Sequence, residues 1–357
     1  MNTNYKFYKM SKNLLTIFFL TTISAAIVSC EKENTMLPPR QISDGNTITL
    51  NGGTGGANAV NSVYVGFITG KQDSVRRLGW DLGFYCGADF KVIINNTTAA
   101  SAKATTKTDI SAITTADTAG FADELMLGNG YGTMAIIDDV EGDLTKTVFS
   151  PISANDADNK VYVVCPSNGF IAAAKDWYKV RVTRNGGGYR VQYAKLSETA
   201  IKTIDVSKDA AYNFRYVSFD NNQIVPVEPE KETWDIHWGV TTYLFPPDLP
   251  FTYSDFVYIN YLAGVEAAEV MNTTVTYANY TEANIATTTF SKSKTAIGSK
   301  WRATTPSASA SVKTDRFYVI KDPTGNIYKL KFISFTSTDG GQRGKPVIEY
   351  KLVKPAK

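Results

Sequence analysis

The chain has 357 residues, of which 43% are hydrophobic and 20% charged, with 37 Lys and Arg against 34 Asp and Glu. This is ordinary globular composition, long enough for two domains, and without long same-sign charge runs it argues against a disordered chain and against a nucleic-acid-binding surface. A single His excludes paired-His ligation of a metal within one chain.

The first thirty residues have the pattern of an export signal. Three lysines precede an uncharged run over residues 14–28, which has the length of a signal-peptide core and is short of a membrane-spanning helix. The run ends in Ile27-Val28-Ser29-Cys30, which resembles the lipobox of bacterial lipoproteins. We therefore expect a signal peptide over residues 1–29 and acylation of Cys30, which anchors the chain to a membrane. An ordinary secretory signal with an incidental Cys is the alternative.

Residues 30–58 have the composition of a tether. Removing residues 1–29 takes away three Lys and no acid, so the mature chain has no net charge. The next residues, Glu31-Lys32-Glu33-Asn34, resemble the acidic surface-export tag of Bacteroidetes lipoproteins, and the segment that follows is rich in Asn, Gly, Pro and Thr. We expect an outer-membrane lipoprotein exposed at the cell surface.

From about Val63 onward the pattern is that of short strands. Apolar and aromatic residues alternate in stretches that are broken by Gly, Asn, Asp and Pro. Two segments, residues 178–193 and 317–332, each read as strand, glycine-containing turn and strand, which is the signature of a β-hairpin. We predict an all-β fold built mainly of antiparallel sheets.

Two motifs recur in the same order, which indicates an internal duplication. We expect a first β-rich unit over residues 59–203 and a second over residues 204–357. The matching segments are Val63–Phe67 and Trp80–Phe84 in the first unit, and Arg215–Phe219 and Trp234–Trp238 in the second. Chance similarity among aromatic strands is the alternative.

A further pattern is formed by four parts of the chain. They are the segments 80–84 and 92–96, the segment 216–245 with its Val225-Pro226-Val227 run, and the closing segment 317–350. Together they resemble the HmuY family of haem-binding lipoproteins of Bacteroidetes. The resemblance implies a surface-anchored all-β haemophore, without catalytic activity, that binds haem for iron acquisition. It also implies partners, namely a host haem protein and a TonB-dependent outer-membrane receptor.

The family's best-known members hold the iron between two His from loops ahead of the final hairpin, and related members use Met. Here the loop over residues 301–307 offers neither, and the comparable segment 164–166 has no His. The remaining donors include Tyr side chains and Cys165. The candidate haem ligands are Met126, Met134, Met271 and His237.

Each candidate has a simpler interpretation. Met126 and Met134 flank a glycine loop that can bring two thioethers near one pocket, and Met271 lies where a ligand loop of the second unit would fall, but Met is also a common core gap-filler. His237 shares a strand face with Asp235, a pattern typical of an exposed polar pair.

Two cysteines remain after Cys30. For Cys86 and Cys165 a disulfide and two buried free thiols are equally compatible with the sequence of an exported chain.

Catalytic motifs are missing. The sequence has no nucleophile elbow, phosphate-binding loop or cluster of metal ligands, so we expect a protein that is not an enzyme and has no metal site. The acidic turns Asp138-Asp139 and Glu141–Asp143 are of the solvated kind, with Ca²⁺ binding or a glycosidase pair as alternatives. The rival function is a non-haem interaction module on the same scaffold, which binds a glycan, a peptide or a partner receptor.

Overall fold

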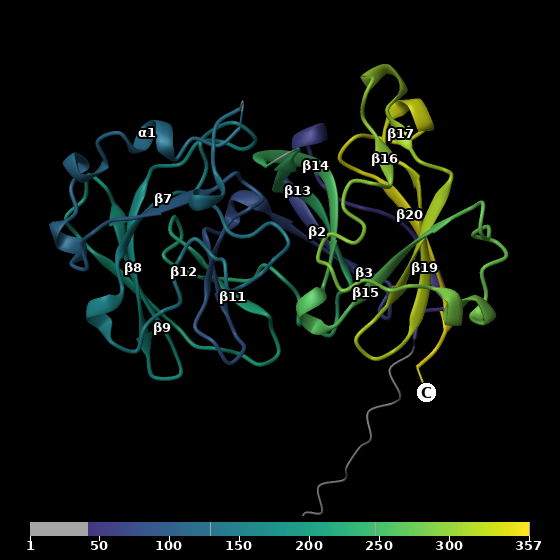
Figure 1. Ribbon diagram of the computed structural model, residues 1–357, viewed down its shortest axis with the longest axis horizontal. Coiled ribbons are helices and arrows are strands. Elements are labelled where there is room, and N and C mark those ends of the chain that lie inside the picture. The colour runs from purple at the N-terminus through teal and green to yellow at the C-terminus, as the bar shows by residue number, and fades with distance from the viewer. Residues whose placement is uncertain (1–41, 129, 247, 357) are drawn as a thin grey trace, which may run out of the picture. The chain divides into compact units, whose positions relative to one another are not determined.

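The computed structural model describes residues 42–128, 130–246 and 248–356. The expected signal peptide and Cys30 lie outside these residues. The described chain is mostly strands in antiparallel sheets, so the predicted all-β class is confirmed (Figure 1). The one α-helix in the described ranges, α1 (Phe121–Glu124), has a single turn, and the other helical segments are short 3₁₀ turns.

A first sandwich contains the strands from β4 to β12. Its five-stranded sheet has the order β10-β9-β8-β7-β6 and its four-stranded sheet the order β12-β11-β4-β5. Both sheets contribute to one core, in which Phe84, Val180 and Tyr193 are fully buried. The strands are β4 (Leu82–Tyr85), β5 (Val92–Ile94), β6 (Ser101–Ala104), β7 (Val161–Cys165), β8 (Tyr178–Asn185), β9 (Gly188–Lys195), β10 (Lys202–Val206), β11 (Phe214–Ser218) and β12 (Gln223–Val225).

A second sandwich combines strands from both ends of the described chain. Its sheets have the orders β1-β20-β19-β18-β15 and β14-β13-β2-β3, and a two-stranded ribbon pairs β16 (Arg302–Ala303) with β17 (Ser311–Val312). The core includes Phe67, Trp238 and Leu330. The strands are β1 (Gly45–Thr49), β2 (Asn61–Gly66), β3 (Lys71–Arg76), β13 (Ile236–Phe245), β14 (Leu249–Ile259), β15 (Glu266–Met271), β18 (Arg316–Lys321), β19 (Ile327–Ser334) and β20 (Val347–Lys354).

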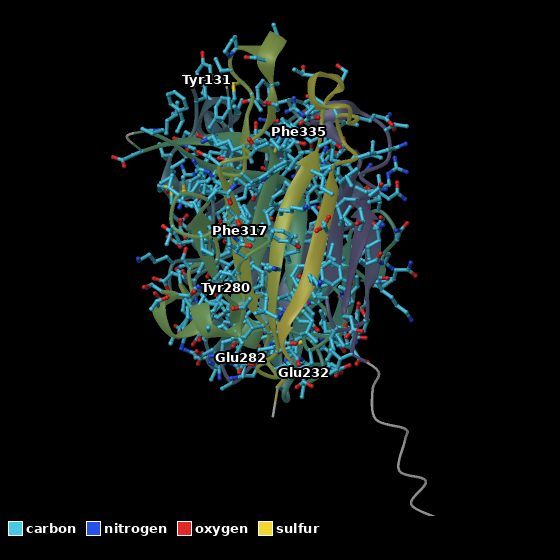
Figure 2. All side chains as sticks on the ribbon, turned by 90° about the vertical axis from the view of Figure 1, so that its right-hand side faces the viewer. Tyr131, Glu232, Tyr280, Glu282, Phe317 and Phe335 are labelled. Atoms are coloured by element: carbon cyan, nitrogen blue, oxygen red, sulfur yellow. The ribbon has the colours of Figure 1, made fainter. Side chains whose placement is uncertain are left out.

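The irregular segment after β15 forms a cover for this sandwich. Tyr280, which is 2% exposed, packs edge-on against Phe317 of β18 with ring centroids 5.5 Å apart (Figure 2). Lys329 of β19 donates hydrogen bonds to the carbonyls of Tyr277 and Tyr280. The outer face of the sheet is thereby buried as well as its inner face, because a loop supplies the second layer.

Both predicted hairpins are confirmed. β8 pairs with β9 through a turn at Asn185–Gly188, and β18 pairs with β19 through a turn in which Gly325 has φ 99°. In that turn the carboxylate of Asp322 accepts hydrogen bonds from the backbone of Thr324 and Asn326. A short polar side chain thus fixes the turn geometry, as expected for Asp at this position.

Part of the expected tether is structured. Residues 45–49 form β1, which pairs with β20 in register from Gly45 with Lys351 to Thr49 with Val347. Ile48 and Leu50 alternate into the core, where they are 7% and 0% exposed. The segment joins the fold because these two apolar side chains lie on one face of an extended chain.

The strand pairing also crosses the expected boundary between residues 203 and 204. β2 pairs with β13, and β4 pairs with β11. The opening strand of each expected unit, β2 or β11, therefore pairs with a strand of the other unit. The predicted boundaries therefore do not coincide with the two sandwiches.

Reciprocal contacts accompany this exchange. The carboxylate of Asp81 accepts a hydrogen bond from the Phe219 amide, and that of Asp235 accepts one from the Phe67 amide, both at 2.7 Å. The Trp before each Asp meets a Tyr of the exchanged strand edge-on. These ring pairs are Trp80 with Tyr216, at 4.8 Å, and Trp234 with Tyr64, at 5.0 Å. Such matching contacts support the duplication, which stays a prediction.

Candidate functional site

Two of the three predicted methionine ligands lie at the surface rather than in the core, and Met271 is half-buried. Met126 is 40% exposed and Met134 is 38% exposed, on either side of a turn that Gly128 and Tyr131 close by mutual backbone hydrogen bonds. The chain thus brings these two side chains to one exposed turn. Met271 ends β15 in the second sandwich and belongs to a different sheet.

His237 is buried, so the expectation of an exposed polar pair with Asp235 is wrong. Its ring lies between the cross-strand neighbours Tyr64 and Tyr258, stacked on Tyr258 at 4.1 Å and edge-on to Tyr64 at 4.9 Å. The side chain is 1% exposed, and neither ring nitrogen has a hydrogen-bond partner among the described residues. Burial lowers the pKa of His237 to about 3. The imidazole is therefore neutral at physiological pH.

Cys86 and Cys165 are both free thiols, so the disulfide that was one of the two alternatives is not formed. Cys86 is half-buried at the end of β4, and Cys165 is buried at the end of β7. Burial raises the pKa of Cys165 to about 11, which leaves this thiol protonated and unreactive at neutral pH.

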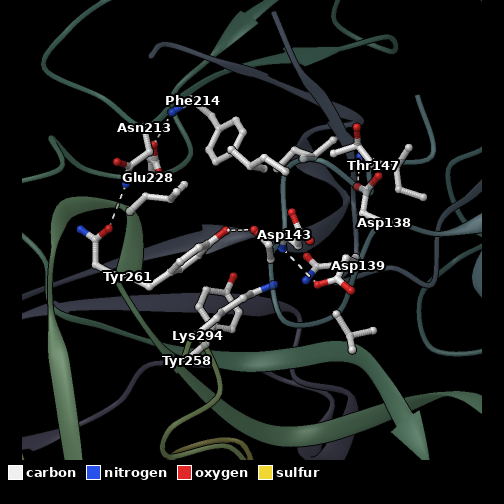
Figure 3. A pocket seen from close by; sticks show the side chains of 18 of the residues that line it. Asp138, Asp139, Asp143, Thr147, Asn213, Phe214, Glu228, Tyr258, Tyr261 and Lys294 are labelled. Carbon is white, nitrogen blue, oxygen red and sulfur yellow. Dashed lines mark hydrogen bonds between the residues drawn. The ribbon is translucent and has the colours of Figure 1, made fainter. Parts of the chain in front are cut away.

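An aromatic cavity lies where the exchanged strands meet (Figure 3). Its volume is about 100 Å³, and both sandwiches contribute to its wall. The aromatic residues that line it are Tyr64, Trp80, Phe214, Tyr216, Trp234, Tyr258 and Tyr261. The charged residues in the lining are Asp138, Asp139, Asp143, Glu228 and Lys294.

Two of these acids, the half-buried Asp138 and the buried Glu228, accept hydrogen bonds from backbone amides. Asp138 accepts hydrogen bonds from the amides of Ile94 and Val148, both at 2.8 Å, and Glu228 accepts one from the Phe214 amide at 2.6 Å. Burial raises the pKa of Asp138 to about 7 and that of Glu228 to about 8. The turn at Asp138 is therefore not a solvated surface turn, because its carboxyl pins β5 to the following loop.

One loop closes the cavity. Gly142, with φ 83°, accepts a hydrogen bond from the Tyr261 hydroxyl at 2.7 Å, and an added Cβ at this glycine would lie 2.3 Å from that oxygen. The neighbouring carboxylate, that of Glu141, accepts hydrogen bonds of 2.7 to 2.9 Å from hydroxyls of the second sandwich. The donors are Tyr243, Ser293 and Thr295. We call residues 138–147 the clamp loop.

A larger open groove lies behind the cavity. It measures about 630 Å³ and is lined by β3 and β12, the last strands of their sheets, together with the segment 212–216 and the prolines Pro226 and Pro229. Phe214, Tyr216 and Glu228 line both spaces and form the wall between them.

The polar side chains of this groove are those of two arginines and Tyr212, together with Asp73, Ser74, Tyr216 and Glu228. Arg215 pairs with Asp209 at 3.1 Å, and its guanidinium lies 5.2 Å from the Tyr212 ring centroid. Arg76, at the end of β3, is exposed. Neither arginine nor Tyr212 was predicted as a site residue, although Arg215 opens one of the repeated motifs. Only the pairing of distant strands brings them to one groove.

The arrangement does not provide a metal centre from acidic or sulfur ligands. No group of three or more His, Cys, Asp or Glu side chains in the described part of the chain is placed to hold a metal ion. None of the four candidate haem ligands lines the cavity or the groove.

The fold and the site define an all-β protein of two interlocked sandwiches with an aromatic cavity and an open groove. The sequence pattern of the HmuY protein family matches residues 58–350, so the chain belongs to the HmuY family. No curated protein and no solved structure matches it. In the described ranges, no helix has both the length and the apolar character that a membrane crossing requires.

Proposed function

We propose that this chain is a non-enzymatic binding protein that takes up haem or a related porphyrin at the cell surface for iron acquisition, and that the groove between β3 and β12 holds the ligand. Membership of the HmuY family supports the ligand class. The observation that carries the location is the groove volume of about 630 Å³, within the range of roughly 300–1,000 Å³ for small-molecule sites. The cavity of about 100 Å³ is too small for a porphyrin.

The groove also has suitable chemistry. Val75, Val225 and Val227 with the edges of the aromatic wall offer an apolar surface to a flat macrocycle. Arg76 and Arg215 supply guanidinium groups, which pair well with carboxylates such as the two propionates of haem. The Tyr212 phenol is an oxygen donor in the lining, and tyrosinate is a known axial ligand of haem iron.

The remaining parts of the proposal concern anchoring and transfer. Acylation of Cys30 would hold the protein at the outer membrane with the fold outside the cell. A host haem protein would supply the ligand, and a TonB-dependent receptor would accept it.

Haem titration of the mature chain, followed in the Soret region, tests this function. We expect a saturable shift, and a loss of affinity of roughly tenfold for each of Arg76→Ala and Arg215→Ala, because each removes a charge-assisted contact. Arg190→Ala is the matched control, since Arg190 is likewise ion-paired with an Asp, at 2.8 Å, but on β9. Tyr212→Phe is expected to change the ferric spectrum while iron-free protoporphyrin binds as before.

Two outcomes contradict the proposal in different ways. If Met126→Ala and Met134→Ala abolish binding while the arginine variants do not, the site is the exposed glycine turn. If absorption stays featureless and does not saturate, the chain does not bind haem.

The rival function, an interaction module, has one observation in its favour. β3 and β12 are each the last strand of a sheet and both line the groove, so an extended peptide could add to either edge. Failure of the haem titration would make this the working hypothesis, ahead of glycan or receptor binding elsewhere.

A further inference from the structure

The lining of the aromatic cavity includes one ammonium group, that of Lys294. The residue comes from the segment 291–298, which bridges to β14 at Gly298 and to β15 at Ser291. Its side chain reaches between Tyr258 and Tyr261 (Figure 3), with Nζ 5.0 Å from the Tyr258 ring centroid. Burial lowers the pKa of Lys294.

This ammonium has no hydrogen bond and no ion pair among the described residues, although Asp138, Asp139 and Glu141 are near enough to raise its pKa. An ammonium group has three donors and no acceptor. Lys294 is partly exposed. Its donors have no acceptor in the described part of the protein, so a ligand can supply one.

Each acid in the cavity wall accepts at least one hydrogen bond, whereas Lys294 donates none among the described residues. Asp138 and Glu228 hold backbone amides, as described above. Asp143 accepts hydrogen bonds from Thr145 and pairs with Lys146 at 3.0 Å, while Asp139 accepts the Asp143 amide at 3.0 Å. Among the charged side chains of the wall, Lys294 is the one without a hydrogen bond or ion pair in the described part of the chain.

We propose that the cavity is a binding site for a short-chain monocarboxylate, whose carboxylate pairs with Lys294 and whose alkyl chain packs against the aromatic wall. The volume of about 100 Å³ corresponds to roughly three waters at about 30 Å³ each, which suits a molecule of about six heavy atoms. The site is separate from the groove proposed for the porphyrin, since Phe214, Tyr216 and Glu228 stand between them.

A ligand series on the mature chain tests the charge preference. The probes are butyrate, n-butylamine and 1-butanol, which have similar size and differ in charge. Binding is followed by calorimetry and by tryptophan fluorescence, because Trp80 and Trp234 line the cavity. We expect saturable binding of butyrate, at least roughly tenfold tighter than either of the other probes, as for a charge-assisted contact.

Variants test the role of the ammonium. Lys294→Met keeps the length of the side chain and removes the charge, so we expect it to weaken butyrate binding by at least roughly tenfold. Lys292→Met, at an exposed neighbour whose nearest acid is Glu266 at 3.7 Å, should leave binding unchanged. Haem titration of both variants should match the natural chain.

The proposal is overturned if n-butylamine binds more tightly than butyrate, if no probe binds saturably, or if Lys294→Met binds butyrate as the natural chain does. Should Lys294→Met fail to fold, the preference among the three probes on the natural chain still decides the question.

Discussion

A single buried residue, His237, makes the free energy of unfolding fall at acidic pH. A His in an unfolded chain has a pKa near 6.5, whereas burial between Tyr64 and Tyr258 lowers the pKa of His237 to about 3. The folded state therefore binds this proton less readily than the unfolded state. The stability that comes from keeping the imidazole neutral is complete above pH 6.5 and is lost as the pH falls towards 3. Asp138 and Glu228, whose pKa values are raised, act in the opposite direction, because their protonation favours the fold.

We expect His237→Phe to keep the ring stack and to remove this acid sensitivity. Urea unfolding from pH 7.5 to pH 4.5 should show a difference in unfolding free energy between variant and natural chain that is flat above pH 7. Below pH 6 the difference should change in favour of the variant by up to about 1.4 kcal/mol per pH unit. The contributions of Asp138 and Glu228 cancel in this difference. Tyr258→Phe, which retains the imidazole, is the control, and parallel curves for His237→Phe would refute the prediction.

At the scale of elements, β1 extends the described fold into the segment that was predicted as a tether. It is the last strand of its sheet, and without it β20 would become a long unpaired edge. Its contribution to the core is the alternation of Ile48 and Leu50 towards the inside with Thr47 and Thr49 towards solvent. Because β1 is part of a sheet, the described fold includes residues 45–49 and does not begin only at residue 59, the predicted start of the first unit.

We expect Leu50→Ala to lower the unfolding free energy by about 2–5 kcal/mol, as for other fully buried leucines. Thr49→Ala, at the exposed neighbouring position, should change it by less than about 0.5 kcal/mol. Chemical denaturation of the mature chain measures both. Equal, negligible effects would mean that this segment behaves as a tether in solution.

At the scale of the whole molecule, the two sandwiches differ in how they are assembled. All strands of the first sandwich lie between Leu82 and Val225, whereas the second is built from residues on both sides of that range. The first sandwich is therefore a continuous insertion into the second. A cut at residue 203 separates β11 and β12 from their sheet, while cuts near residues 80 and 229 leave that sheet complete.

We expect a fragment of residues 80–229 to unfold cooperatively by itself, because it contains every strand of the first sandwich. A fragment of residues 59–203 should not, because β4 loses β11 as its neighbour. Thermal unfolding followed by circular dichroism distinguishes them. A cooperative transition in residues 59–203 alone would show that strand exchange is not required for folding.

How far the sequence predicts this molecule depends on the distance between interacting residues. The hairpins at residues 178–193 and 317–332 follow from local alternation and turn chemistry. The pairing of β2 with β13 does not, since nothing local in either strand specifies a partner far along the chain. The burial of His237 was missed because alternation gives the face of a strand but not what covers that face. The groove was missed for the same reason, since only tertiary pairing brings Arg76 and Arg215 into the lining of one groove.

The pairing of β1 with β20 also bears on how the chain reaches its native state. Ile48 pairs with Ile348, so one of the first structured strands to be synthesised has to wait for the last. Long-range pairings of this kind slow folding and expose unpaired strands in the meantime. The inserted sandwich can form early, whereas closure of the other waits for the final hairpin and its neighbour β20. During that interval β1 and β2 need protection from strands of other chains, which makes folding, more than the stability of the finished protein, the step most vulnerable to aggregation.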